Sequence, residues 1–448
     1  MACVSRCDRR FLNVILLGFG FMFVFTAFQT MGNIEKTVLD SIQADDPEFR
    51  GDGYTSLAVI YAVFAVCNWL APSIISVVGP RLTMVIGGIT YALFILTFLL
   101  PKTWLLYVAS CVIGFGAAII WTGQGNYLTL NSDSSTISRN SGIFWAMLQA
   151  SMFFGNLFVY FKFQGKTHID HETRMVVFIV LIVLAAVGIV FLLVLRPAER
   201  ADGEMVGKDT TGPLTALKKA FRLFFTKDMM LLTLTFFYTG IELSFFSGVY
   251  GPSVGFTLQI GPNAKQLVGL SGIFIGVGEV TGGLLFGILG HKTIRWGRDP
   301  IVIMGFVIHL LSFFLIFLNL PNSAPFQDTN DEAYISSSAY IAMLCSLLLG
   351  FGDSCYNTQI YSILGGVWAD DSAAAFALFK FTQSVAAAAS FFYSSHVGLH
   401  AQLAILLVLS TLGTVMFCWV EWRSRARRDR QHSPDLSQVE GSIATKGD

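Results

Sequence analysis

The chain has 448 residues, of which 54% are hydrophobic and only 13% are charged, and its mean hydropathy is +0.63. Soluble domains carry about 25% charged residues, so this composition excludes a soluble globular protein. Lys+Arg and Asp+Glu both number 29, so net charge does not indicate a nucleic-acid partner. The apolar residues form long runs, which are typical of a protein that crosses the membrane several times.

Twelve apolar stretches are long enough to cross a bilayer as helices, for which about 20 residues are needed. These stretches are residues 11–31, 56–77, 82–100, 104–126, 141–163, 175–195, 229–250, 266–289, 300–320, 338–361, 373–394 and 400–420. They do not alternate apolar and polar residues, as the strands of a transmembrane barrel would. The sequence therefore predicts an all-α polytopic membrane protein with twelve transmembrane helices.

The positions of the basic residues predict the orientation. Most Lys and Arg residues, including those of 196–228 and 423–430, lie on one side of the membrane if both termini are cytosolic. The opposite loops collect acidic residues, namely Glu35, Asp40, Asp45, Asp46, Glu48, Asp52, Asp328, Asp331 and Glu332. We therefore expect cytosolic N- and C-termini. No sorting motif specifies the plasma or the endolysosomal membrane.

The longest polar connection divides the twelve spans into six and six. The predicted segments are a cytosolic N-terminus (1–10), an N-terminal six-helix bundle (11–195), a cytosolic central loop (196–228), a C-terminal six-helix bundle (229–422) and a basic cytosolic tail (423–448). Gly114-Phe115-Gly116 recurs as Gly350-Phe351-Gly352, which favours an internal duplication. In duplicated transporters the substrate site lies near the midplane, between the halves.

Ionisable side chains inside predicted spans are the strongest candidates for function, since each costs about 2.5–3.5 kcal/mol on insertion scales and usually faces a cavity or a partner. Four such residues are Glu242, Glu279, Asp353 and Lys380. Asn357 follows Asp353 at i,i+4 and Gln383 follows Lys380 at i,i+3, so each pair shares a helix face. We expect an ion pair between Asp353 and Lys380. It would either lock two helices together or form a site for protons or for a substrate carboxylate.

The N-terminal spans carry a neutral polar set instead: Asn68, Trp121, Gln124, Asn126 and Gln149. Trp121 and Gln124 lie about one turn apart, so they could stack on and hydrogen-bond to a solute, or equally join two helices. Gly276-x-Gly278 resembles a dinucleotide loop, but no strand precedes it. The sequence contains no phosphate loop, nucleophile elbow or metal-ligand cysteine pair, so we expect neither an enzyme nor a bound cofactor.

Residues 116–129, which read Gly-Ala-Ala-Ile-Ile-Trp-Thr-Gly-Gln-Gly-Asn-Tyr-Leu-Thr, resemble the hallmark of the uncoordinated-93 family, a branch of the major facilitator superfamily. Further similarity lies in residues 25–30, 53–57, 139–145, 245–251, 269–279, 350–355 and 379–381. The resemblance extends over about residues 11–423. It implies the major facilitator fold, in which spans 1, 2, 4, 5, 7, 8, 10 and 11 line a central cavity.

Members of that family include orphan carriers and also accessory proteins that regulate a potassium channel or escort receptors. The resemblance thus implies fold and family more than activity, and the charged residues beside the cavity favour a secondary transporter of an unidentified small solute, with proton coupling left open. The alternative is a non-transporting regulatory or trafficking subunit, whose partner would be a channel or receptor in the same bilayer. The superfamily's gating turn is incomplete here, since Val78-Gly79-Pro80-Arg81 lacks the acidic residue.

Overall fold

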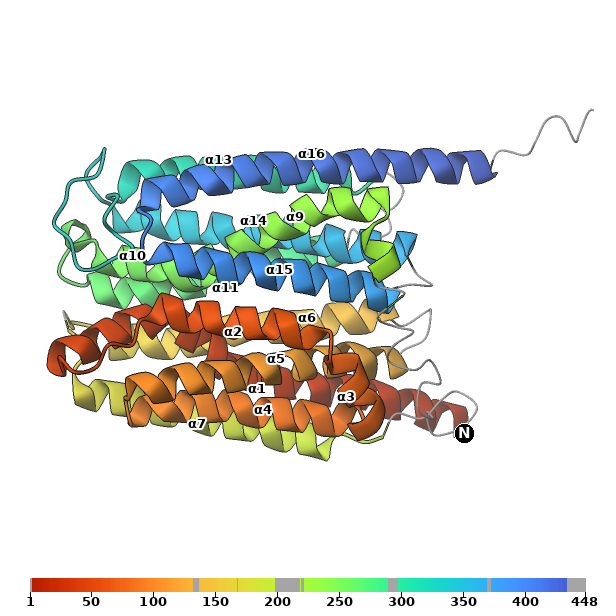
Figure 1. Ribbon diagram of the computed structural model, residues 1–448, viewed down its shortest axis with the longest axis horizontal. Coiled ribbons are helices and arrows are strands. Elements are labelled where there is room, and N and C mark those ends of the chain that lie inside the picture. The colour runs from red at the N-terminus through yellow and green to blue at the C-terminus, as the bar shows by residue number, and fades with distance from the viewer. Residues whose placement is uncertain are drawn as a thin grey trace, which may run out of the picture.

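The computed structural model of the protein is built almost entirely of helices that run along one axis (Figure 1). It describes residues 2–131, 137–166, 168–197, 218, 221–288, 297–368 and 372–432. Most of the predicted central loop and of the basic tail, and residues 289–296 between the eighth and ninth predicted spans, lie outside this range. Figure 1 shows the helices up to α7 on one side of the molecule and those from α9 onward on the other, and we call these groups the N-terminal and C-terminal halves.

The helices of the N-terminal half cover the first six predicted spans. They are α1 (Ala2–Asp45), α2 (Gly53–Asn68), α3 (Ala71–Val78), α4 (Pro80–Leu96) with the short turn η1 (Thr97–Leu99), α5 (Thr103–Leu130), α6 (Ile137–Lys162) and α7 (His171–Val194). The second predicted span is shared between α2 and α3.

The C-terminal half covers the other six predicted spans. Its elements are α9 (Lys227–Ser244), η2 (Phe245–Val249), α10 (Tyr250–Phe256), η3 (Leu258–Ile260), α11 (Ala264–Ile288), α13 (Asp299–Asn319), α14 (Ala339–Val367), α15 (Ser372–Ser394) and α16 (Leu399–His432). The seventh span runs through α9, η2 and α10. Its middle part, η2, is a π-helical turn, a feature that is frequent at functional sites.

The outer faces of the bundle are apolar. Ten helical stretches within the described residues are long and apolar enough to cross a membrane. On α7 the large apolar side chains of Ile179, Val183, Val187 and Val190 are exposed at the spacing of one helix face. A soluble protein would not expose such faces, whereas lipid covers them at no cost. The chain is therefore an integral, multi-pass membrane protein.

Helix α1 is longer than predicted and corrects the assignment of the first outer loop. Hydropathy places the end of the span near residue 31, but the helix continues to Asp45. Glu35, Asp40 and Asp45 consequently lie on a helix rather than in a loop. Glu35 is completely buried against Ser56, and the Lys36 ammonium binds Asp40 and Asp52 at 2.9 and 3.0 Å.

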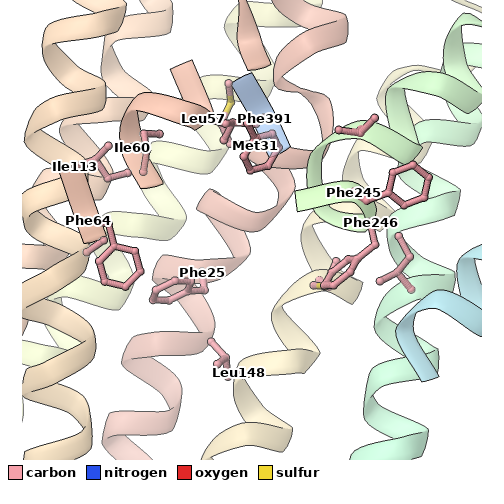
Figure 2. Packing of buried hydrophobic residues seen from close by; sticks show 14 of the residues in the cluster. Phe25, Met31, Leu57, Ile60, Phe64, Ile113, Leu148, Phe245, Phe246 and Phe391 are labelled. Carbon is pink, nitrogen blue, oxygen red and sulfur yellow. The ribbon is translucent and has the colours of Figure 1, made fainter. Parts of the chain in front are cut away.

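The two halves meet along α2 against α15 and α6 against α11. Buried apolar side chains from both halves belong to one continuous cluster. Figure 2 shows Met31, Leu57 and Phe391 gathered where the halves meet, and the ring of Phe391 stacks on that of Tyr61 with 5.6 Å between the centroids. This packing sets the positions, along the axis of the bundle, at which the polar residues of the two halves face each other.

The first gating turn depends on a glycine. Gly79 joins α3 to α4 with φ +89° and ψ 152°, a region open essentially to glycine alone. A Cβ there would meet no atom within 4 Å, so any cost of substitution comes from the backbone.

We therefore expect Gly79→Ala to destabilise the protein by about 1 kcal/mol. The measurement is the melting temperature of the purified protein in detergent. Gly283→Ala is the matched control, since a Cβ at this α11 glycine also meets open space but the backbone is helical. Equal melting temperatures for the two variants would refute the backbone explanation.

Candidate functional site

Two buried carboxyl groups of the C-terminal half are hydrogen-bonded to each other. They belong to Glu242 of α9 and Asp353 of α14, whose side chains are 1% and 6% exposed. Two ionised carboxylates offer only acceptors, so a hydrogen bond between these groups requires a shared proton. Asn357 Nδ2 donates to Asp353 Oδ1 at 2.7 Å, as the i,i+4 spacing predicts. The arrangement can therefore hold a proton between two carboxyl groups in the interior of the protein.

A histidine that the sequence analysis did not single out completes this cluster. His309 of α13 is fully buried, and its Nε2 lies 3.5 Å from Glu242 Oε1 and 3.2 Å from the Leu349 carbonyl oxygen. Its Nδ1 is hydrogen-bonded to the Tyr238 hydroxyl. The available signal was an ionisable side chain in the middle of the span 300–320. A prediction restricted to carboxylates and lysines within spans omits it.

Glu279 extends the polar cluster from α11 to the other half. Its carboxyl group is hydrogen-bonded to Gln149 of α6, and the Ser354 hydroxyl of α14 donates to its backbone carbonyl at 2.7 Å. Gly278 and Gly350 let α11 and α14 approach closely, because a Cβ on either would overlap with backbone atoms of the facing helix. Close packing of small residues thus sets the position of Glu279.

None of the described ion pairs joins Asp353 directly to Lys380 as predicted, although the two charges attract each other through space. The Lys380 ammonium of α15 instead donates to Gln383 Oε1 at 2.9 Å, one helical turn along the same face. Gln383 Nε2 in turn lies 3.3 Å from the Thr239 hydroxyl of α9. The pair is not formed because the Asp353 carboxyl group is held by Glu242 and Asn357.

Aromatic rings surround Lys380 and join the two halves. Its Nζ lies 4.7 Å from the ring centroid of Phe379, 5.7 Å from that of Tyr361 and 5.9 Å from that of Trp121, which belongs to α5 in the other half. Trp121 stacks on Trp145 of α6 at 5.9 Å, and Trp145 meets Tyr361 edge-on at 5.3 Å. The site therefore receives side chains from α5, α6, α14 and α15.

Not every predicted site residue belongs to this cluster. Asn68 and Gln124 are buried, whereas Asn126 is exposed near the end of α5. None of the described contacts joins these three side chains to Glu242, Asp353 or Lys380. The other eight predicted residues form three contact groups: Glu242 with Asp353 and Asn357, Glu279 with Gln149, and Lys380 with Gln383 and Trp121. The charge of Asp353 acts through space on Glu242, Glu279 and Lys380, so the three groups are neighbours. No group of three or more His, Cys, Asp or Glu residues suited to a metal ion is found among the described residues.

Polar contacts tie the halves together at the end of the bundle where α2 begins, which we call the Asp52 end. Ser395 Oγ donates to Asp52 Oδ1 at 2.8 Å, and the Tyr54 hydroxyl donates to the Pro325 carbonyl oxygen at 2.9 Å. Burial raises the pKa of Asp52. The Lys36 ammonium and the N–H and hydroxyl of Thr55 together lower this pKa by more than burial raises it, so it lies below its usual value. Asp52 is thereby kept ionised as a hydrogen-bond acceptor that holds α15 against α2.

Substitution of the buried histidine tests the contacts of the cluster. His309→Leu leaves the buried Tyr238 hydroxyl without its partner, and an unsatisfied buried polar group costs about 1–3 kcal/mol. We expect the melting temperature to fall accordingly. Phe314→Leu on the exposed face of the same helix is the control, and it should change little. A His309→Leu protein as stable as this control would contradict the assigned contacts.

Comparison with known proteins gives the family. Residues 49–418 match the family described as "Ion channel regulatory protein UNC-93". The chain is 47% identical to UNC93-like protein MFSD11 of Xenopus tropicalis over 448 aligned residues, which cover 96% of this chain and all of that protein. Both findings agree with the resemblance seen in residues 116–129.

Solved structures with the same fold are transporters. A mutant form of the nucleoside transporter NupG matches with a TM-score of 0.63 and 14% identity, over 90% of this chain and 99% of that one. A mutant form of the peptide transporter POT, in complex with alafosfalin, matches with a TM-score of 0.64 and 14% identity, over 91% and 94%. At such identity the likeness shows the fold alone, which is that of major facilitator transporters. By sequence, this chain belongs to the UNC-93 family.

Proposed function

We propose that the protein is a secondary carrier that moves a small solute across the membrane through the polar cluster between its halves. The observation that supports this most is the shared-proton pair of Glu242 and Asp353, buried beside Lys380 at a place where side chains of both halves meet. Buried charges are costly in a membrane protein and are characteristic of substrate and proton pathways. A purely structural bundle would not need them.

Proton coupling is part of the proposal. The groups that face the carboxyl pair are Glu279 from α11, His309 from α13, Lys380 from α15, and Tyr238 and Tyr356 from α9 and α14. Glu279 reaches Gln149 of the N-terminal half, so a change of its protonation alters a contact between halves. Movement of the halves relative to each other is how such carriers expose their site to either side.

We also propose that both termini are cytosolic. Figure 1 shows the start of α1 and the end of α16 at the same end of the bundle, opposite the Asp52 end. Arg298, Arg423, Arg425 and Arg427 cluster where α13 and α16 reach that end. Basic residues favour the cytosolic side. Tags at either terminus should react with antibody only after the membrane is permeabilised, and reaction in intact cells would contradict this orientation.

The experiment that tests the carrier proposal is a screen of melting temperature against a metabolite library at two pH values. A solute that binds only the folded protein stabilises it by RT ln(1 + [L]/Kd). We expect a solute that shifts the wild type but not the Asp353→Asn/Lys380→Met double variant. The matched control is Asp170→Asn/Lys166→Met, which removes an exposed pair of the same residue types at 3.0 Å. A well-folded wild type that no solute shifts would contradict the proposal.

A second function is favoured by the description of the family as ion channel regulatory proteins. In that case the protein is a non-transporting regulatory or trafficking subunit, and its lipid-facing helices contact a channel or receptor in the same membrane. The polar cluster would then serve only to hold the helices together. Two results together would select this function. No solute would shift the melting temperature, and a membrane protein would copurify equally with the wild type and the double variant.

A further inference from the structure

Lys380 has hydrogen-bonding capacity that the protein does not use. An ammonium group carries three N–H donors. Among the described residues, Gln383 Oε1 is the one hydrogen-bond acceptor that contacts Lys380 Nζ, and the other neighbours are the ring faces of Phe379, Tyr361 and Trp121. The nearby carboxyl groups do not neutralise this charge by direct contact, since those of Glu242 and Asp353 bind each other.

The side chains around Lys380 keep part of their surface accessible. Lys380, Trp121, Trp145 and Tyr361 lie where the halves face each other, yet all four are only half-buried. Ring contacts among them cross from one half to the other, so their accessible surface belongs to the interior rather than to the lipid face. A small molecule there would touch both halves at once.

We propose that this site binds a small organic monocarboxylate with a flat apolar body. The carboxylate accepts hydrogen bonds from the Lys380 ammonium, and the body lies against the rings of Trp121, Trp145 and Tyr361. This inference rests on the proposed carrier function and names its substrate class.

The charges of the site favour a carboxylate over other ligands. Aromatic rings attract cations, but here the protein's own ammonium occupies that place, and it would repel an amine. Phosphate groups are usually held by arginine forks or several donors, whereas this site offers one lysine. A neutral polar solute could accept from the Lys380 N–H donors but would bring no charge to match the ammonium. A single negative charge with an apolar body satisfies both the ammonium and the rings.

The test is the melting temperature of the purified full-length protein with sodium benzoate, hexanoate, benzamide and benzylamine. We expect benzoate to raise the melting temperature more than benzamide, and benzylamine to have no effect. Lys380→Met should weaken the apparent affinity for benzoate at least tenfold, whereas Lys380→Arg retains the preference for benzoate over benzamide. Trp121→Leu should weaken the binding of benzoate but keep this preference. Lys162→Met, at an exposed lysine of α6, is the control.

Several results would overturn the assignment. One is stabilisation by benzylamine or benzamide as strong as that by benzoate, and another is an unchanged benzoate shift in Lys380→Met. If none of the carboxylates acts but another solute of the metabolite library shifts the wild type and not the double variant, the carrier function stands and the substrate class is refuted. If no solute of either set acts, both proposals fail.

Discussion

Gly350→Ala is expected to destabilise the protein by about 3 kcal/mol, at the upper end of the usual cost of overpacking. A Cβ at Gly350 would overlap with the Ile275 carbonyl oxygen and approach the Glu279 backbone nitrogen. Because these are backbone atoms, no side-chain rotation relieves the overlap, and α14 must move away from α11. The shift would also displace Glu279 and Asp353, which lie within one turn of the contact.

The measurement is the melting temperature in detergent, read beside that of Gly283→Ala. Gly283 lies on α11, but a Cβ there meets no atom within 4 Å. The control variant should keep the wild-type melting temperature and its response to solute. A Gly350→Ala protein as stable as the control would show that α11 and α14 are not packed as closely as described.

Asp353→Asn should separate solute exchange from proton-driven accumulation. Asparagine can keep hydrogen bonds to Glu242 and Asn357, but it cannot gain or lose the shared proton. In liposomes with an inward proton gradient of one pH unit, coupling to one proton supplies about 1.4 kcal/mol and thus about a tenfold concentration ratio. We expect this ratio for the wild type and no accumulation for Asp353→Asn, with exchange of labelled for unlabelled solute retained.

The control for this experiment is Asp170→Asn, which changes the same residue type in an exposed ion pair. It should accumulate solute like the wild type. If Asp353→Asn accumulates solute at the wild-type level, the coupled proton binds at another residue. Loss of both exchange and accumulation would assign Asp353 to solute binding instead of coupling.

The sequence predicted the helices well and their ends less well. Apolar runs locate all twelve helical stretches because lipid and protein interior both accept apolar side chains. Hydropathy could not reveal that α1 continues to Asp45, because Glu35 and Lys36 interrupt the apolar run, whereas in the structure Lys36 is paired with Asp40 and Asp52. Those partners lie on other segments or farther along the helix, and an average over a window does not register them.

Local spacing predicted the site better than long-range pairing did. The i,i+4 and i,i+3 rules placed Asn357 beside Asp353 and Gln383 beside Lys380. The Asp353–Lys380 ion pair failed because Glu242, from a helix more than 100 residues earlier, competes for the carboxyl group. Nor does spacing predict that Glu279 binds Gln149, since this contact depends on how α11 packs against α6.

The most direct test of the solute site is an experimental structure of the protein with the solute that stabilises it most in the screen. We predict that the solute lies between α5 and α15, with an oxygen within hydrogen-bonding distance of Lys380 Nζ and its body against the Trp121 ring. A solute bound on the lipid-facing surface, or inside the protein without contact to Lys380, would contradict it.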